Sequence, residues 1–137
     1  MKKFFLLVAL VLMILSSGCT KKVDLGPGYE RMSKDFLQAM RWKDFEGAAA
    51  YLEEGHRQDM LVRFSESRDL HIVGAAYQYS RLNKKMGAAQ SEMILEYYLL
   101  PSTRVQEWVW KMDWVLIPAG TKQRGIWQVQ GVPPAFP

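Results

Sequence analysis

The chain has 137 residues, a formal net charge of +4 and one cysteine, Cys19. A single cysteine excludes an internal disulfide, so the core has to hold the domain together without one. The basic residues form no stripe, which argues against a nucleic-acid partner. The length is that of one domain, and it is large enough to bury a hydrophobic core.

Residues 1–18 have the pattern of a signal peptide. Two lysines precede an unbroken apolar run from Phe4 to Leu15. This run is shorter than the about 20 residues that cross a membrane as a helix, and it has the length of the apolar part of a signal peptide. The small residues at 16–18 then lead directly to Cys19.

The stretch from Leu15 to Cys19 resembles the lipobox of bacterial lipoproteins. The resemblance implies that the signal peptide is removed before Cys19, that the sulfur carries a diacylglycerol and that the new amine is acylated. Several acyl chains anchor a protein stably, whereas one chain gives only reversible binding. We therefore expect a lipid-anchored protein of the bacterial cell envelope. Thr20 implies the outer membrane, facing the periplasm, if the source is Gram-negative.

The rest of the chain divides into three parts. Residues 19–28 contain the sequence Gly-Pro-Gly and form a polar tether between the lipid and the domain. Residues 29–131 form the folded domain. Residues 132–137 are rich in proline, which cannot donate the backbone hydrogen bonds of a strand. We expect this tail to leave the domain as an extended strap or as a loose end.

Three helices are expected first in the domain. In residues 29–43 the apolar side chains recur at helical spacing on one face, namely Tyr29, Met32, Phe36 and Met40. Asp44 is a suitable N-cap for a second helix through residues 48–52, which should end near Gly55. A short third helix is expected over residues 56–65, where the spacing recurs in Met60, Leu61 and Phe64.

The periodicity then changes to that of strands. Residues 70–82 are rich in β-branched and aromatic side chains. Residues 91–99 and 108–116 alternate between apolar and polar side chains, the pattern of strands with one buried face. A last strand is expected at residues 126–129. Helices followed by antiparallel strands indicate an α+β fold, in which the helices pack on a curved four-stranded sheet that forms a cone with a pocket.

Two segments resemble the NTF2-like (cystatin-like) superfamily of cone-shaped α+β domains. "FLQAMRWKDFEGAAAYL" is similar to its opening helices, and "WVWKMDWVLIPAGTKQRGIWQV" is similar to its final hairpin of tryptophan-bearing strands. The resemblance covers residues 29–131. It implies the same cone, which in the enzymes of the superfamily, such as relatives of ketosteroid isomerase and scytalone dehydratase, holds Asp, His and Tyr for proton transfer.

Few residues carry a chemical signature. The sequence has no nucleophile elbow, phosphate-binding loop or zinc-protease motif. The two histidines lie 15 residues apart, and we expect no catalytic motif, no metal site and no cofactor. The candidates for proton transfer are His71, Tyr77, Tyr97 and Asp113. Asp113 alternates with the tryptophans of its strand, so it should face away from them.

Aromatic side chains supply the candidates for a ligand or partner site, which are Tyr77, Tyr97, Trp108, Trp110, Trp114 and His71. Aromatic residues carry much of the energy of interfaces, and they also build ordinary cores.

Two functions are compatible with these features. The first is a membrane-anchored lipoprotein whose domain binds a small apolar ligand or a protein partner without catalysis, with a homodimer left open. The second is an envelope enzyme of isomerase or dehydratase type that uses the cone pocket. A cone filled by its own Trp and Met side chains favours the first function. A buried, pKa-shifted His or Asp beside a Tyr favours the second.

Overall fold

The computed structural model describes residues 28–65, 68–118 and 125–136. The signal peptide, Cys19 and the tether up to residue 27 lie outside this part of the chain, so the assignments made for them remain predictions. Within the described residues, no helix is both long enough and apolar enough to cross a membrane.

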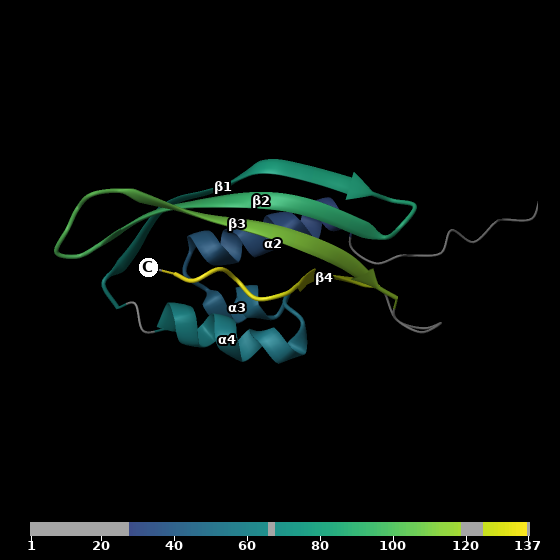
Figure 1. The fold of residues 1–137 in the computed structure, drawn as a ribbon, viewed down its shortest axis with the longest axis horizontal. Helices are drawn as coiled ribbons and strands as arrows, with labels where there is room; N and C mark the ends of the chain where they lie inside the picture. The colour runs from purple at the N-terminus through teal and green to yellow at the C-terminus, as the bar shows by residue number, and fades with distance from the viewer. Residues whose placement is uncertain (1–27, 66–67, 119–124, 137) are drawn as a thin grey trace, which may run out of the picture.

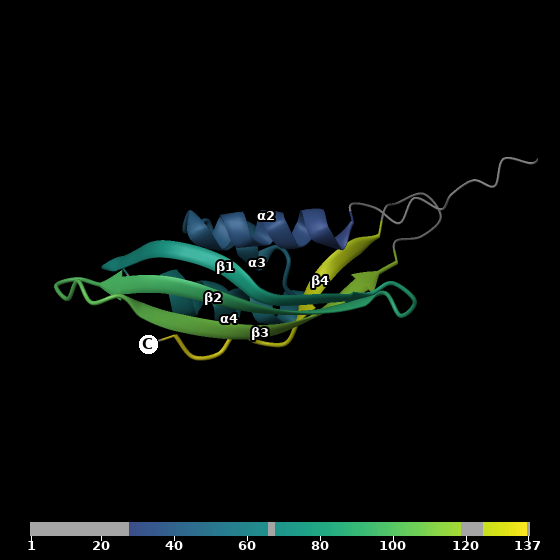
Figure 2. The same ribbon diagram turned by 90° about the horizontal axis from the view of Figure 1, so that it is seen from above.

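Three helices and four strands form two layers (Figure 1). The strands make one antiparallel sheet in the order β1-β2-β3-β4, so neighbours in the chain are neighbours in the sheet. The helices all lie on one side of this curved sheet (Figure 2). The α+β fold class expected from the sequence is therefore confirmed. The elements are α2 Tyr29–Arg41, α3 Phe45–Ala49, α4 Glu54–Ser65, β1 Leu70–Asn83, β2 Ala88–Leu99, β3 Gln106–Ile117 and β4 Ile126–Gln130.

Local hydrogen bonds fix the junction between α2 and α3. Lys43 has a positive φ of 61°, and the N–H groups of Lys43 and Asp44 donate to the carbonyl oxygens of Met40 and Ala39. This is a Schellman termination of α2. The Asp44 side chain accepts a hydrogen bond from the Gly47 N–H at 2.9 Å, which confirms Asp44 as the N-cap of α3.

The expected extent of the second helix is wrong, because residues 51–53 pair with β4 instead. Leu52 forms an isolated parallel bridge with Val129. The Val129 N–H donates to the Tyr51 carbonyl oxygen at 2.8 Å, and the Glu53 N–H donates to the Val129 carbonyl oxygen at 3.1 Å. Backbone groups that pair with β4 are not available for helical hydrogen bonds. The helix α3 therefore ends at Ala49, and α4 begins at Glu54. The bridge covers the outer edge of β4.

Alternation places one face of β2 and β3 in the core. From Trp108 to Trp114, every second side chain of β3 is buried and the intervening ones are exposed. β1 is less regular, because its pairing with β2 shifts register after Ile72 and after Tyr77. Shifts of this kind bend a strand and increase its twist, which contributes to the curvature of the sheet.

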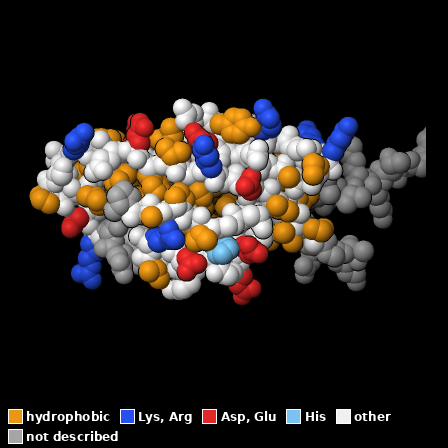
Figure 3. Space-filling view, in the orientation of Figure 1, with side chains coloured by type: hydrophobic (Ala, Val, Ile, Leu, Met, Phe, Trp, Pro, Cys, Tyr) orange, Lys and Arg blue, Asp and Glu red, His pale blue; other side chains and the backbone are white. Residues whose placement is uncertain are grey.

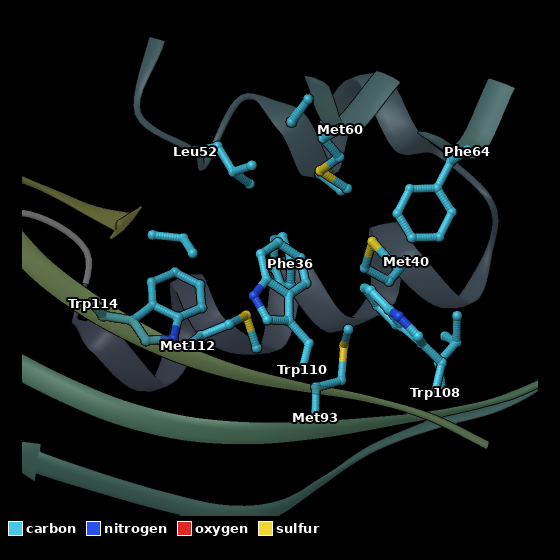
Figure 4. Packing of buried hydrophobic residues seen from close by; sticks show 14 of the residues in the cluster. Phe36, Met40, Leu52, Met60, Phe64, Met93, Trp108, Trp110, Met112 and Trp114 are labelled. Atoms are coloured by element: carbon cyan, nitrogen blue, oxygen red, sulfur yellow. The ribbon is translucent and has the colours of Figure 1, made fainter. Parts of the chain in front are cut away.

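Phe36 of α2 lies where the two layers meet. Its ring is fully buried, and it meets Trp110 and Trp114 of β3 edge to face, with centroids 5.8 and 5.5 Å apart. Flexible apolar side chains fill the space around these rings (Figure 4), including Met40, Leu52, Met60, Met93 and Met112. Methionine adapts to irregular gaps. The interior of the cone is therefore occupied by the chain's own side chains.

Two glycines adopt a backbone conformation that other residues reach only at a cost. Gly87 between β1 and β2 has a φ of 59°, and Gly131 after β4 has a φ of 79°. Changing either to Ala should lower the free energy of unfolding by about 1–2 kcal/mol. Gly87→Ala should cost more, since its Cβ would lie 3.3 Å from the Leu116 Cβ, whereas nothing lies within 4 Å at Gly131. Urea unfolding of Gly87→Ala and Gly131→Ala measures the two losses of stability. Equal losses would contradict the contact with Leu116.

Candidate functional site

Aromatic side chains from three elements meet the C-terminal tail at one end of the sheet. Phe64 lies in the last turn of α4, Tyr97 near the end of β2 and Trp108 near the start of β3. All three are buried, and together we call them the aromatic box. The ring of Phe136 lies against each of them, with centroid distances of 4.8 Å to Phe64, 4.9 Å to Tyr97 and 5.6 Å to Trp108.

Contacts with neighbouring strand and helix residues fix the positions of the three rings of the aromatic box. Leu95 lies opposite Trp108 in the β2–β3 register, so Tyr97 and Trp108 are diagonal neighbours on the inward face. Phe64 meets Trp108 edge to face at 5.4 Å and stacks on Phe45 at 4.7 Å. Figure 4 shows Phe64 and Trp108 facing one another at one end of the buried cluster. These contacts do not involve the tail.

The tail runs back from β4 along β3 towards the box (Figure 1). Pro133 and Pro134 have no backbone N–H, so this segment cannot pair as a regular strand. The Trp108 indole Nε1 donates a hydrogen bond to the Ala135 carbonyl oxygen at 3.1 Å. The tail is extended, but it packs back on the domain instead of leaving it as the sequence pattern predicted, and Phe136 covers the box.

The Tyr97 hydroxyl is the second polar group of the box. The side chain is 1% exposed, and its hydroxyl is not among the fully buried atoms that lack a hydrogen-bond partner. No hydrogen bond joins it to another described residue, so its oxygen is at the accessible edge of the ring. Burial raises the pKa of Tyr97, because the ionised form would lose its hydration. The hydroxyl therefore keeps its proton at neutral pH and is available as a donor or an acceptor.

The other aromatic candidates are structural. Trp110 and Trp114 lie in the middle of the core against Phe36, and the Trp114 Nε1 donates to the Ser91 Oγ at 2.9 Å. Tyr77 joins the layers, because its hydroxyl donates to the Ser33 carbonyl oxygen of α2 at 2.7 Å. Burial raises the pKa of Tyr77 well above its usual value, and the neighbouring Tyr29 adds to this effect.

The histidine candidate lies on the opposite face of the sheet from the box. His71 is exposed at the start of β1, and its ring stacks on Tyr98 with centroids 4.9 Å apart. Tyr98 is on the opposite face of β2 from Tyr97. The structure therefore brings together Tyr97 and Trp108 from the set of candidates and leaves His71 outside the cone.

The carboxylates of the strands lie on the outer face of the sheet. Asp113 is exposed, as its alternation predicted, and its Oδ1 accepts a hydrogen bond from the Gln90 Nε2 at 3.1 Å. Glu92 pairs with Lys111 at 3.6 Å. These groups line a hollow with Tyr79, and the pairing of their charges is typical of a solvated polar surface.

The buried polar or charged residues among those described are Ser33 and Ser91. The same residues include no cluster of His, Cys, Asp or Glu that could hold a metal ion. Proton transfer by a general base needs a carboxylate or an imidazole near the substrate. What the box offers instead is stacking on three rings, one indole N–H and one phenol hydroxyl.

Phe64 and Phe136 complete the site, and neither was among the residues selected from the sequence. Phe64 was assigned only to the apolar face of a helix. Phe136 is the one aromatic residue in a tail of small residues and prolines. An isolated aromatic side chain in such a segment is a signal for an anchoring contact. In the structure Pro133 is a second anchor, since it is buried.

No protein-family model and no curated protein matches the sequence. Solved structures match the fold. RPA3114 from Rhodopseudomonas palustris, a protein containing a SEC-C motif, aligns with a TM-score of 0.53 and 15% identity over 85% of this chain and 83% of its own. ActVI-ORFA from Streptomyces coelicolor aligns with a TM-score of 0.49 and 13% identity over 74% of this chain and 92% of its own.

An LEH-like epoxide hydrolase from M. tuberculosis aligns with a TM-score of 0.43 and 13% identity, over 73% of this chain and 79% of its own. Identities this low show the fold alone. What these solved structures share with this chain is the α+β architecture of helices on a curved antiparallel sheet.

Tyr77→Phe and Tyr97→Phe form a matched pair, since each removes one hydroxyl. Tyr77→Phe also removes a hydrogen bond to Ser33, so the free energy of unfolding at neutral pH should fall by about 1–2 kcal/mol. Tyr97→Phe removes a hydroxyl without a partner in the described part of the chain, so the change should be close to zero or stabilising. Equal losses in urea unfolding would contradict these assignments.

The same variants report on the raised pKa values at alkaline pH. An unfolded tyrosine ionises near pH ~10, whereas burial holds the pKa of Tyr77 well above that value and raises the pKa of Tyr97 in the folded chain. The free energy of unfolding that depends on a protonated tyrosine is fully present below pH ~10. Above this pH it falls by up to about 1.4 kcal/mol per pH unit for each tyrosine, because the unfolded chain releases the proton first. Each Phe variant should therefore lose stability less steeply. An unchanged alkaline slope in both would contradict the shifts.

Proposed function

We propose that the chain is a lipid-anchored envelope lipoprotein whose NTF2-like domain binds a protein partner without catalysis. In a Gram-negative source it lies at the outer membrane and faces the periplasm. The anchor rests on the signal pattern that ends at Cys19. The observation that carries the binding role is the filled interior of the cone.

Because the interior of the cone is filled by side chains, a binding site has to lie on the surface of the domain. A small-molecule site is a cavity of about 300–1,000 Å³ that encloses most of its ligand. Here Phe36, Trp110 and Trp114 occupy the corresponding space, together with the buried methionines around them. Two hollows lined by described residues are open ones, over the outer sheet face and between β3 and the tail.

The hollow beside the tail has the composition of a protein-binding surface. It is lined by Val109, Trp110, Lys111, Val132 and Pro134. Val109 and Val132 are 41% and 43% exposed, and Figure 3 shows hydrophobic side chains gathered over β3 and the tail. β4 pairs with β3 only from Asp113 onward, so residues 106–112 of β3 have no strand on that side. An apolar strand edge of this kind favours a partner that covers it.

The enzymatic alternative, an isomerase or dehydratase, needs a carboxylate or an imidazole inside the cone. His71 and Asp113 are on the outside, and the buried polar residues of the described chain are two serines. The epoxide hydrolase among the matched structures does not alter this balance, because its similarity is too low to carry an activity across. An isomerase or dehydratase activity that Tyr97→Phe abolishes would overturn the non-catalytic role.

Cys19→Ser tests the anchor. Protein with Cys19 should fractionate with membranes and have the mass of a chain that begins at residue 19 and carries covalent lipid. Cys19→Ser lacks the sulfur that accepts the lipid, so it should keep its signal peptide or appear in the soluble fraction. Membrane fractionation with intact mass measurement gives the answer. Ser17→Ala keeps the cysteine and should behave as the wild type. A mature chain with an unmodified Cys19 would overturn the anchor.

A further inference from the structure

The tail is held on the domain by the buried Pro133, the half-buried Phe136 and one hydrogen bond. Its prolines lack N–H groups, and the hydrogen bond from Trp108 to Ala135 is the one that joins it to the rest of the described chain. Phe136 supplies the ring contacts, and it remains only half-buried against the box. A segment held in this way opens more readily than a paired strand.

The box behind the tail does not depend on it. Phe64 packs on Phe45 and Trp108 packs on Trp110, whose ring centroid is 5.6 Å away. Tyr97 is fixed by its place in β2, between two paired strands. Departure of the tail would therefore expose a preformed aromatic surface that has an indole N–H at its rim and an unpaired hydroxyl within it.

We propose that the aromatic box is a peptide-binding site and that Phe136 is its intramolecular plug. The ligand is an aromatic side chain on an extended apolar segment of a partner protein, with a backbone carbonyl one residue earlier to accept the Trp108 hydrogen bond. The tail shows this chemistry, because Ala135 supplies the carbonyl and Phe136 the ring. The assignment rests on the proposed protein-binding function and names the chemistry of the partner.

Tail and partner occupy the same site, so they exclude each other. Five residues separate Phe136 from the end of β4. A ligand tethered by so short a link competes at an effective concentration in the millimolar range. A free peptide that binds the open box with a Kd of about 0.1 mM or lower should therefore bind the closed chain at least about tenfold more weakly.

The test uses Phe136→Ala in the full chain, purified in detergent. The probe is a fluorescent peptide with the tail sequence Gly-Val-Pro-Pro-Ala-Phe-Pro, and its binding is followed by fluorescence anisotropy. The peptide should bind Phe136→Ala at least about tenfold more tightly than it binds the wild type. Val132→Ala is the matched control, because Val132 is in the same tail and 43% exposed. The Val132→Ala variant should bind the peptide as weakly as the wild type does.

A second peptide tests the chemistry of recognition. It has Ala in place of Phe, and it should show no binding to Phe136→Ala at concentrations that saturate the first peptide. Equal binding of both peptides would overturn the proposal, as would equal binding of the first peptide to wild type and variant, or no binding to either. A wild-type dimer in which the tail of one copy fills the box of another would overturn the intramolecular plug.

A measurement on the unaltered fold covers the case in which Phe136→Ala fails to fold. 4-Fluorophenylalanine incorporated at position 136 gives a ¹⁹F NMR signal from the ring in the box. Addition of the peptide in millimolar excess should move this signal to the position of a solvent-exposed ring, and an unmoved signal would overturn the proposal. Negative results in these peptide-binding and NMR experiments would overturn only the proposal that Phe136 plugs the aromatic box. Failure of the proposed function would show separately, as an unlipidated Cys19 or as catalysis.

Discussion

The packing of Phe36 against the inward row of β3 holds the two layers of the domain together. The ring is fully buried between the helices and the sheet, and it meets Tyr51, Trp110 and Trp114 at centroid distances of 5.9, 5.8 and 5.5 Å. Burial of one such side chain contributes about 1.5–3 kcal/mol, and edge-to-face pairs add to this. With no disulfide in the chain, contacts of this kind between α2 and β3 have to hold the layers together.

The same packing decides where the protein can act. A curved sheet with helices on one face could enclose a pocket, but here large rings and methionines take up the enclosed volume. The binding surface that we propose consequently lies at the end of the sheet and along residues 106–112 of β3, beside the tail. There Phe136 of the tail covers the aromatic box, and Val132 and Pro134 of the tail line an open hollow with the exposed Val109.

Much of the fold could be predicted from local patterns. The alternation in β2 and β3 identified their buried faces correctly, because one face of a strand must point into the core. Asp44 was recognised as a cap, since capping depends on residues only a few positions away. The bridge between Leu52 and Val129 could not be predicted, because no local signal marks a pairing between positions so distant in the chain.

The candidate site was predicted only in part for the same reason. Tyr97 and Trp108 were selected because they face inward on adjacent strands. Their meeting with Phe64 and Phe136 depends on how α4 and the tail close over the sheet, which is a property of the whole fold. Trp110 and Trp114 alternate along β3 in the same way as Trp108. Only the folded structure shows that Trp110 and Trp114 lie in the core and that Trp108 lies at its end.

Native mass spectrometry of the gently purified protein tests the central claim, that the cone is filled by its own side chains. The expected mass is that of the polypeptide with its covalent lipid and nothing further bound. A non-covalent molecule of roughly a few hundred daltons, lost when Trp110 is changed to a small residue, would contradict the claim. It would show that the cone encloses a ligand site.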